Sequence, residues 1–158
     1  MMDENKIVLA KEVYDTLCSA IDNRKWKYQK EEENLTVFFG VNTDDIPMNF
    51  ILVVDVERQI VRLMSPMPFN MCEEKRLDGA IAVCVASLGL VDGNFDYNFA
   101  DGRIVFRMTT SFKECVIGEG LFDYMISCSC VMVDEYNEKF FAINEGLMSI
   151  EEFIAKTE

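Results

Sequence analysis

The fold is decided by one stretch, Gly89-Leu-Val-Asp-Gly-Asn-Phe-Asp-Tyr-Asn-Phe-Ala-Asp-Gly-Arg-Ile-Val-Phe-Arg107, which ends a helix and then forms a hairpin. From Asn94 to Phe99 polar and aromatic residues alternate, which is the period of a strand with one apolar face. Asp101-Gly102 is a pair that two-residue hairpin turns prefer. This turn predicts the apolar pairs Phe99–Ile104, Tyr97–Phe106 and Phe95–Met108, and it places Asp96 opposite Arg107 on the other face.

The same alternation predicts a second hairpin, with strands over 48–55 and 59–65 and a turn at Glu57-Arg58. Pro47 opens its first strand, where the missing proline N–H does no harm. Because side chains alternate along a strand, the register separates the residues into two faces. One face is wholly apolar, with Phe50, Leu52, Val54, Val61 and Leu63, and the other is mixed, with Asn49, Ile51, Val53, Asp55, Ile60, Arg62 and Met64.

Helices are predicted where apolar residues recur at helical spacing, over 6–23, 71–89 and 120–145. Ser149 and Glu152 form a capping box, which opens a short last helix. In the helix over 71–89, Asn70 is the expected cap. The expected buried stripe of that helix is Leu77, Ala80, Ile81, Cys84, Val85 and Leu88.

Two more strands are predicted over 25–30 and 35–41, and Ser65-Pro-Met-Pro-Phe69 reads as a stiff extended connector. The element order is therefore α-ββ-ββ-α-ββ-αα. Strands joined by short turns pair antiparallel. We therefore expect a single α+β domain over 1–158, with an antiparallel sheet of about six strands and helices on one of its faces.

The charge balance argues against several classes of partner. The chain has 28 acidic and 15 basic residues and a net charge of −13. Such a surface repels phosphate backbones and anionic membranes, so we expect neither nucleic acid nor a membrane as partner. The longest apolar run, over 79–91, is too short to span a bilayer and fits a buried helix.

Six cysteines, at 18, 72, 84, 115, 128 and 130, raise the question of disulfides. The chain opens Met-Met-Asp-Glu-Asn-Lys, with acids where a secretory signal has basic residues. Several cysteines also fall at apolar helix positions, where cysteine behaves as a small hydrophobe. We therefore expect reduced core thiols in a cytoplasmic protein.

Catalytic and metal-binding patterns are missing from the sequence. There is no histidine, which removes the commonest general base and metal ligand, and there is no Cys-x-x-Cys or glycine-rich phosphate loop. Asp92-x-Asn94-x-Asp96 has the spacing that begins a calcium loop, but Tyr97 and Arg103 stand where that loop needs Gly and Glu. We predict no catalytic, cofactor-binding or metal-binding residue. An enzyme would need a carboxylate or thiol with a strongly shifted pKa in a cleft, and Cys72 and Cys115 are the thiols to probe for reactivity.

A binding surface is predicted on the mixed face of the second hairpin. Methionines cluster at 64, 67 and 71 around the proline-rich connector, and a methionine-lined surface can accept varied apolar partners. A contiguous apolar patch marks an interaction site. The predicted partner-binding residues are Ile51, Val53, Ile60, Arg62, Met64 and Met67.

Four ordered segments resemble the YbjN family: Pro47-Met-Asn-Phe-Ile-Leu-Val-Val-Asp55, Ser65-Pro-Met-Pro-Phe69, Leu90-x-Asp92-Gly-x-Phe-Asp96 and Gly102-x-Ile-x-Phe-Arg107. The resemblance covers about residues 45 to 155. That family is similar in fold to type III secretion chaperones, which are small acidic α+β proteins, commonly dimeric, that bind segments of other polypeptides. Its members are also labelled sensory-transduction regulators. The resemblance implies a non-enzymatic binding role.

Two functions follow as hypotheses. The first is a chaperone-like adaptor, with a regulatory role as an option, that binds a protein or peptide and acts as a homodimer. For the dimer the sequence offers the helix over 71–89, whose Val83 and Ala86 lie off its main stripe and suggest burial within or between chains. The alternative is a small-molecule-binding sensory or regulatory protein with a pocket between sheet and helices.

Overall fold

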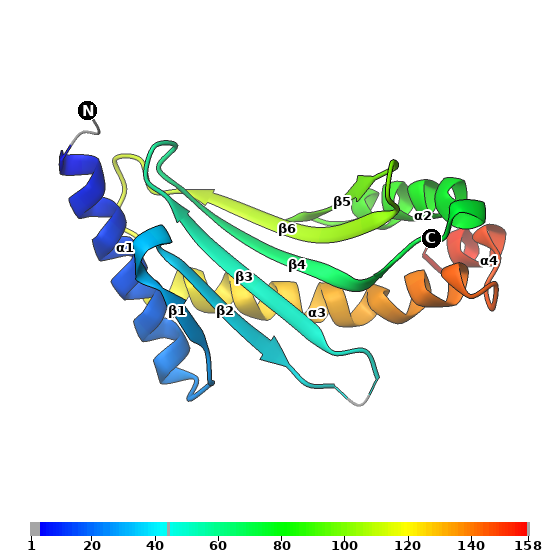
Figure 1. Ribbon diagram of the computed structural model, residues 1–158, viewed down its shortest axis with the longest axis horizontal. Helices are drawn as coiled ribbons and strands as arrows, with labels where there is room; N and C mark the ends of the chain where they lie inside the picture. Colours follow the sequence, from blue (N-terminus) through cyan, green and yellow to red (C-terminus); the bar gives the residue numbers. More distant parts are fainter. Residues whose placement is uncertain (1–3, 44, 158) are drawn as a thin grey trace.

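The computed structural model describes residues 4–43 and 45–157 (Figure 1). Its helices are α1 (Glu4–Asn23), α2 (Arg76–Leu88), α3 (Glu119–Asn144) and α4 (Ile150–Thr157). Its strands are β1 (Gln29–Glu31), β2 (Thr36–Val41), β3 (Met48–Asp55), β4 (Ile60–Asn70), β5 (Asn94–Asn98) and β6 (Arg103–Ser111). The strands form one antiparallel sheet in the order β1-β2-β3-β4-β6-β5. The predicted element order and fold class are confirmed.

One face of the sheet is covered by helices. Figure 1 shows α3 crossing behind the strands, with α1 at one end and α2 and α4 at the other. The Oγ of Ser129, on α3, lies 3.3 Å from the sulfur of Met108 on β6, so α3 packs on the face that carries Met108. Arg24 joins the end of α1 to α3, since its Nε lies 2.7 Å from a carboxylate oxygen of Asp123. No helix in the described part of the chain is both long and apolar enough to cross a membrane.

The hairpin of β3 and β4 has the predicted register. Leu52 pairs with Leu63 and Val54 with Val61, and all four side chains are buried against the helices. The predicted separation into an apolar and a mixed face is therefore confirmed. A shift by one residue would expose this whole set to water, which explains why the pattern fixes the register here.

The proline-rich segment is part of β4, so its prediction as a separate connector was wrong. Ser65 pairs with Phe106 and Pro66 with Val105 across to β6, followed by a register shift before Asn70. The pairs between β3 and β4 end at Met64. Beyond that point β4 keeps one neighbour, and a strand with a free side tolerates proline.

The hairpin of β5 and β6 is displaced by two residues from the predicted register. Phe95 pairs with Phe106 and Tyr97 with Ile104. Four residues, Phe99 to Gly102, connect the strands in place of the predicted two, and the Gly102 N–H donates to the Asn98 carbonyl at 2.8 Å. Side-chain oxygens of Asn98 and Asp101 accept the N–H groups of Ala100 and Arg103 at 3.1 and 3.0 Å, which stabilises the longer connection. A shift of two keeps each residue on its predicted face, but it leaves Phe99 in the loop, 57% exposed.

Helix α2 buries the opposite side from the one predicted. Its buried residues are Gly79, Ala82, Val83 and Ala86, whereas Leu77, Ile81, Cys84 and Leu88 are exposed. Small residues allow a close approach, because a Cβ added at Gly79 would lie 2.7 Å from Met71 Cγ. Asn70 is not its cap either: a 3₁₀ turn, Glu73–Lys75, precedes α2, and Lys75 at the N-cap makes no capping side-chain hydrogen bond.

The two edges of the sheet differ. On the β5 edge, Ser87 of α2 accepts the Phe95 N–H at 3.0 Å and donates to the Phe95 carbonyl at 3.4 Å, so a side chain occupies the strand's outward groups. On the other edge, β1 is shorter than predicted because Lys25 has a left-handed φ of 57° and Trp26 packs on Phe39. β1 pairs only with residues 36 to 38 of β2, so the rest of that edge has no strand beside it in the described chain.

At the C-terminal end the structure follows the sequence closely. Gly146, with a φ of 71°, follows α3, and the buried residues of α3 include Phe122, Met125, Val133 and Phe140, which recur at helical spacing. Met132 is partly buried. The predicted capping box also forms: Glu152 accepts the Ser149 N–H at 2.9 Å and Ser149 Oγ accepts the Glu152 N–H at 3.1 Å.

Candidate functional site

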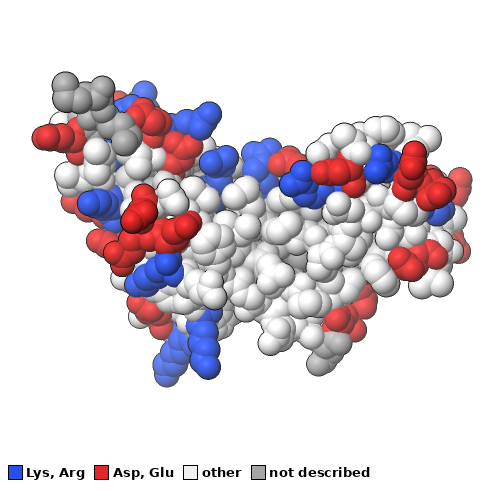
Figure 2. Space-filling model, in the orientation of Figure 1, with Lys and Arg blue, Asp and Glu red and all other residues white. Residues whose placement is uncertain are grey.

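The candidate site is the face of the sheet that no helix covers in Figure 1. Its central side chains are half-buried and lie outside the hydrophobic core. Figure 2 shows an uncharged area over the middle of the sheet, with charged side chains gathered toward its margins. We call this surface the open face and define it by Phe38, Ile51, Val53, Asp55, Ile60, Arg62, Met64 and Arg107.

Five of the six predicted binding residues lie together on the open face. The strand register places Ile51 opposite Met64, Val53 opposite Arg62, and Ile60 opposite Asp55. Met67 does not join them, because it is on the covered face of β4 and only 5% exposed. Met67 lies two residues after Ser65 and four after Leu63, which are also buried, because side chains along β4 continue to alternate through Met67.

The sequence analysis missed Phe38, which extends the apolar centre of the open face. Phe38 of β2 pairs with Ile51 of β3, so Phe38, Ile51 and Met64 form a row across three strands. The alternation in β2 puts Phe38 opposite in direction to the buried Val37 and Phe39. Phe38 can be assigned to the site only if β2 is known to lie beside β3, and the pattern of a single strand does not contain that information.

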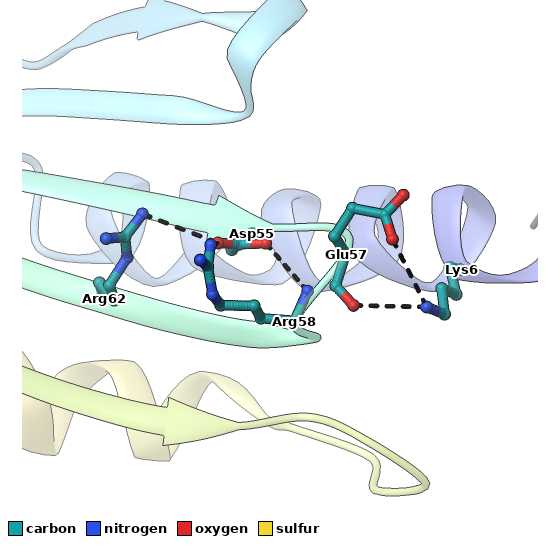
Figure 3. Close-up of polar contacts among 5 residues, drawn as sticks. All are labelled: Lys6, Asp55, Glu57, Arg58 and Arg62. Atoms are coloured by element: carbon teal, nitrogen blue, oxygen red, sulfur yellow. Dashed lines mark hydrogen bonds and ion pairs between the residues drawn. The ribbon is translucent and has the colours of Figure 1, made fainter. Parts of the chain in front are cut away.

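One end of the open face carries a polar group around Asp55 (Figure 3). Asp55 accepts the Arg58 N–H at 2.9 Å and pairs with Arg58 Nη1 at 3.0 Å, while Arg62 Nη2 lies 3.7 Å away. The Arg58 backbone N–H holds the pKa of Asp55 below its ordinary value, with the two guanidinium groups adding to the effect. On the same turn, Lys6 of α1 pairs with Glu57 at 3.7 Å. Asp55 is therefore ionised and already engaged.

Arg107 is fully paired on the same face. Its Nε lies 2.6 Å and its Nη2 3.0 Å from the two carboxylate oxygens of Asp96, a two-point contact. The predicted Asp96–Arg107 pair therefore forms, although Arg107 is diagonal to Asp96, which pairs with Val105 in the ladder. The hydrogen bond from Arg107 lowers the pKa of Asp96. With both oxygens of Asp96 bound to Arg107 and β5 beginning at Asn94, this segment is a strand and has no calcium-loop geometry.

A hollow of about 450 Å³ continues the open face at the sheet edge, where β1 stops. Its wall includes Tyr28, Phe38, Gly40 and Ile51, with Lys27 at the rim. A second hollow of about 440 Å³, beside Val53 and Asp55, lies between the sheet and α1. The first hollow borders the open face, whereas the second lies toward α1 and is lined by Lys11, Glu32 and Glu33 as well as by apolar residues.

Reactive groups do not gather anywhere in the described part of the chain. No three His, Cys, Asp or Glu side chains there form a possible metal site. All six cysteines are free, but only Cys18 is buried. The prediction of core thiols was wrong for Cys72, Cys84 and Cys115, which are exposed. Burial raises the pKa of Cys18, and it raises the pKa of Cys130 to about 11, so these two are poor nucleophiles at neutral pH.

A second apolar surface lies on α2. Its exposed residues Leu77, Ile81, Cys84 and Leu88 recur every three or four positions and share one side of the helix. Leu77 is 64% and Leu88 is 88% exposed. We call this surface the α2 stripe.

The sequence matches no family model and no curated protein. Its fold is nevertheless shared by solved structures. The ExsC–ExsE complex superposes with a TM-score of 0.58 at 11% identity, covering 82% of this chain and 93% of that one. YbjN from E. coli, a proposed transcription regulator, gives 0.55 at 11% identity, covering 83% and 88%. The HopA1–SchA chaperone–effector complex gives 0.50 at 10% identity, covering 89% and 98%. The predicted likeness in fold to YbjN and to type III secretion chaperones is confirmed.

Proposed function

We propose that this chain is a non-enzymatic, chaperone-like module that holds an extended segment of a partner polypeptide on its open face. The observation that carries the proposal is the uncovered row of Phe38, Ile51 and Met64, which lies between charged margins of the sheet. Two structures that share the fold are complexes with a second protein, ExsC with ExsE and SchA with HopA1, which supports a protein partner.

An extended partner suits both the face and its edge. Side chains of an extended segment alternate, so every second residue can contact the open face while the others point to water. Along β2, the residues after Phe38 have no strand beside them in the described chain, so a partner strand placed there can add backbone hydrogen bonds. The hollow beside Tyr28 and Ile51 can then receive its side chains.

The small-molecule alternative finds less support. It needs a lined cavity between sheet and helices. Between the sheet and α3 that space is filled by Leu52, Leu63, Ile104 and Phe122, each 0% exposed, and the hollow beside α1 is lined by Lys11, Glu32 and Glu33 as well as by apolar residues. A sensory or regulatory role therefore stays a prediction from sequence, as does a cytoplasmic location, with which six free cysteines are compatible.

The Ile51→Asp, Val53→Asp double variant tests the binding face. Partner binding would bury the two new carboxylates against apolar side chains, which is unfavourable, so we expect affinity for the partner to fall at least tenfold. The domain is expected to stay folded because both side chains lie outside the core. Partners captured from the native lysate by the unaltered protein are identified first, and their affinities for both proteins are then measured by calorimetry. The matched control is Val131→Asp with Leu147→Asp, two exposed apolar residues away from the open face. Unchanged affinity in the test variant would remove this site from the proposal.

We also propose that two copies associate through the α2 stripe as a homodimer. A stripe of four apolar positions on one side of a helix is self-complementary across a twofold axis, and its exposure in one chain favours burial against another. Ile81→Glu with Leu88→Glu is expected to raise the dimer dissociation constant at least tenfold, because four carboxylates would meet at the interface. Analytical ultracentrifugation measures this, with Val131→Glu and Leu147→Glu as the control. An unaltered protein that sediments as a monomer at high micromolar concentration would contradict the proposal.

A further inference from the structure

Arg62 differs from the other arginine of the open face in being largely unpaired. Its only ion pair within the described residues is the 3.7 Å approach of Nη2 to Asp55. Its Nε is enclosed and has no hydrogen-bond partner there. Thr109 of β6 pairs with Arg62, and Arg107 lies two residues before Thr109 on the same strand. Arg107 donates from Nε and Nη2 to the two carboxylate oxygens of Asp96. Guanidinium groups normally find a carboxylate when they are partly buried.

Asp55 does not supply that carboxylate in full. Its two oxygens already accept the Arg58 N–H and Arg58 Nη1, at 2.9 and 3.0 Å. Two guanidinium groups therefore share one carboxylate, and no second acid is ion-paired with Arg62 among the described residues.

The surroundings of Arg62 would strengthen a new ion pair. Val53 lies opposite it on β3, and Met64 lies two residues further along β4 on the same face. A carboxylate held here under a partner segment would be shielded from water, and charge-assisted hydrogen bonds gain strength in such surroundings. Figure 3 shows the Arg62 guanidinium directed along the sheet toward Asp55, so its other donors are turned away from that contact.

We propose that the open face recognises an acidic residue: the partner segment is extended, and an Asp or Glu side chain pairs with Arg62. The inference rests on the proposed function and specifies the partner's chemistry. Residues two apart in an extended chain point the same way and lie about 6.7 Å apart, as Arg62 and Met64 do along β4. The acidic residue is therefore followed or preceded, two positions away, by an apolar residue that contacts Met64 and Ile51.

Selection of a random peptide library displayed on phage tests this directly. The unaltered protein is expected to enrich peptides with an acidic residue two positions from a large apolar one. The Arg62→Gln variant is expected to enrich peptides with alternating apolar residues but with no preference for an acidic residue. Arg107→Gln is the matched control, since it removes the same charge from the same face, and it is expected to keep the acidic position. Loss of the acidic preference in Arg107→Gln to the same degree would show a general charge effect and overturn the inference.

A peptide-side measurement keeps the test independent of any effect of Arg62→Gln on folding. In an enriched peptide, Glu→Gln is expected to weaken binding to the unaltered protein about tenfold, the size of one charge-assisted contact, and to leave binding to Arg62→Gln unchanged. Equal binding of the Glu and Gln peptides overturns the inference but leaves the proposed function standing. If the unaltered protein enriches no peptide that the Ile51→Asp, Val53→Asp double variant fails to bind, the proposed function is overturned, and this inference falls with it.

Discussion

Gly102→Ala is expected to lower the free energy of unfolding by about 3–5 kcal/mol, combining backbone strain with overpacking. Gly102 has a φ of 76°, where residues with a Cβ are strained. A Cβ at this position would lie 2.2 Å from the carbonyl oxygen of Met71 and 2.9 Å from its nitrogen, and backbone atoms cannot move aside as a flexible side chain can. The Met71 N–H also donates to the Gly102 carbonyl at 2.8 Å, so the clash disrupts a tertiary hydrogen bond.

Gly146→Ala separates these two causes. Gly146 has nearly the same φ, 71°, but a Cβ there would meet no heavy atom within 4 Å. Its substitution is expected to cost about 1 kcal/mol, the price of the left-handed backbone alone. Urea denaturation followed by circular dichroism gives both values. Equal losses in the two variants would mean that the contact with Met71 contributes nothing.

Phe140→Ala is expected to cost about 3–5 kcal/mol, the range for removing a buried aromatic ring. Phe140 of α3 is 0% exposed. Its ring centroid lies 5.1 Å from that of Phe95 on β5 and 5.9 Å from that of Phe153 on α4, so one side chain joins three elements. A cavity at this point would loosen the contact of α3 with both the sheet and α4.

The neighbouring residue provides the control. Phe141 is 39% exposed and packs on Phe69 with centroids 5.3 Å apart. Phe141→Ala removes the same atoms from the same helix, yet it is expected to cost only about 1–2 kcal/mol because a good part of Phe141 already contacts water in the folded state and its loss leaves no closed cavity. Thermal or urea denaturation compares the two. A loss for Phe141→Ala as large as that for Phe140→Ala would contradict the assignment of Phe140 as the central core side chain.

The sequence predicted those parts of the fold whose signal is local. The alternation over 48–65 determined both faces of one hairpin, and the Ser149–Glu152 pair determined the start of α4. The β5–β6 register could not be determined in this way, because a shift by two keeps every side chain on its face and only the length of the loop changes. The prediction for α2 failed for a different reason: small residues were packed against the sheet and large ones left outside.

The candidate site shows the same limit. Ile51, Val53, Ile60, Arg62 and Met64 were found because they share the two strands of one hairpin. Phe38 was missed because its place depends on a neighbouring hairpin, and Met67 was included because the strand was predicted to end before it. The pairing state of Arg62 depends on which acids fold near it, and no strand pattern contains that information.

The unequal edges of the sheet set two kinds of binding against each other. Ser87 occupies the outward N–H and carbonyl of Phe95, so a guest strand cannot pair at that residue, whereas β2 after Phe38 has no strand beside it in the described chain. Two copies that paired edge to edge beside β2 would each cover the margin that a partner strand needs. Strand pairing between copies and strand pairing with a partner are therefore expected to exclude one another.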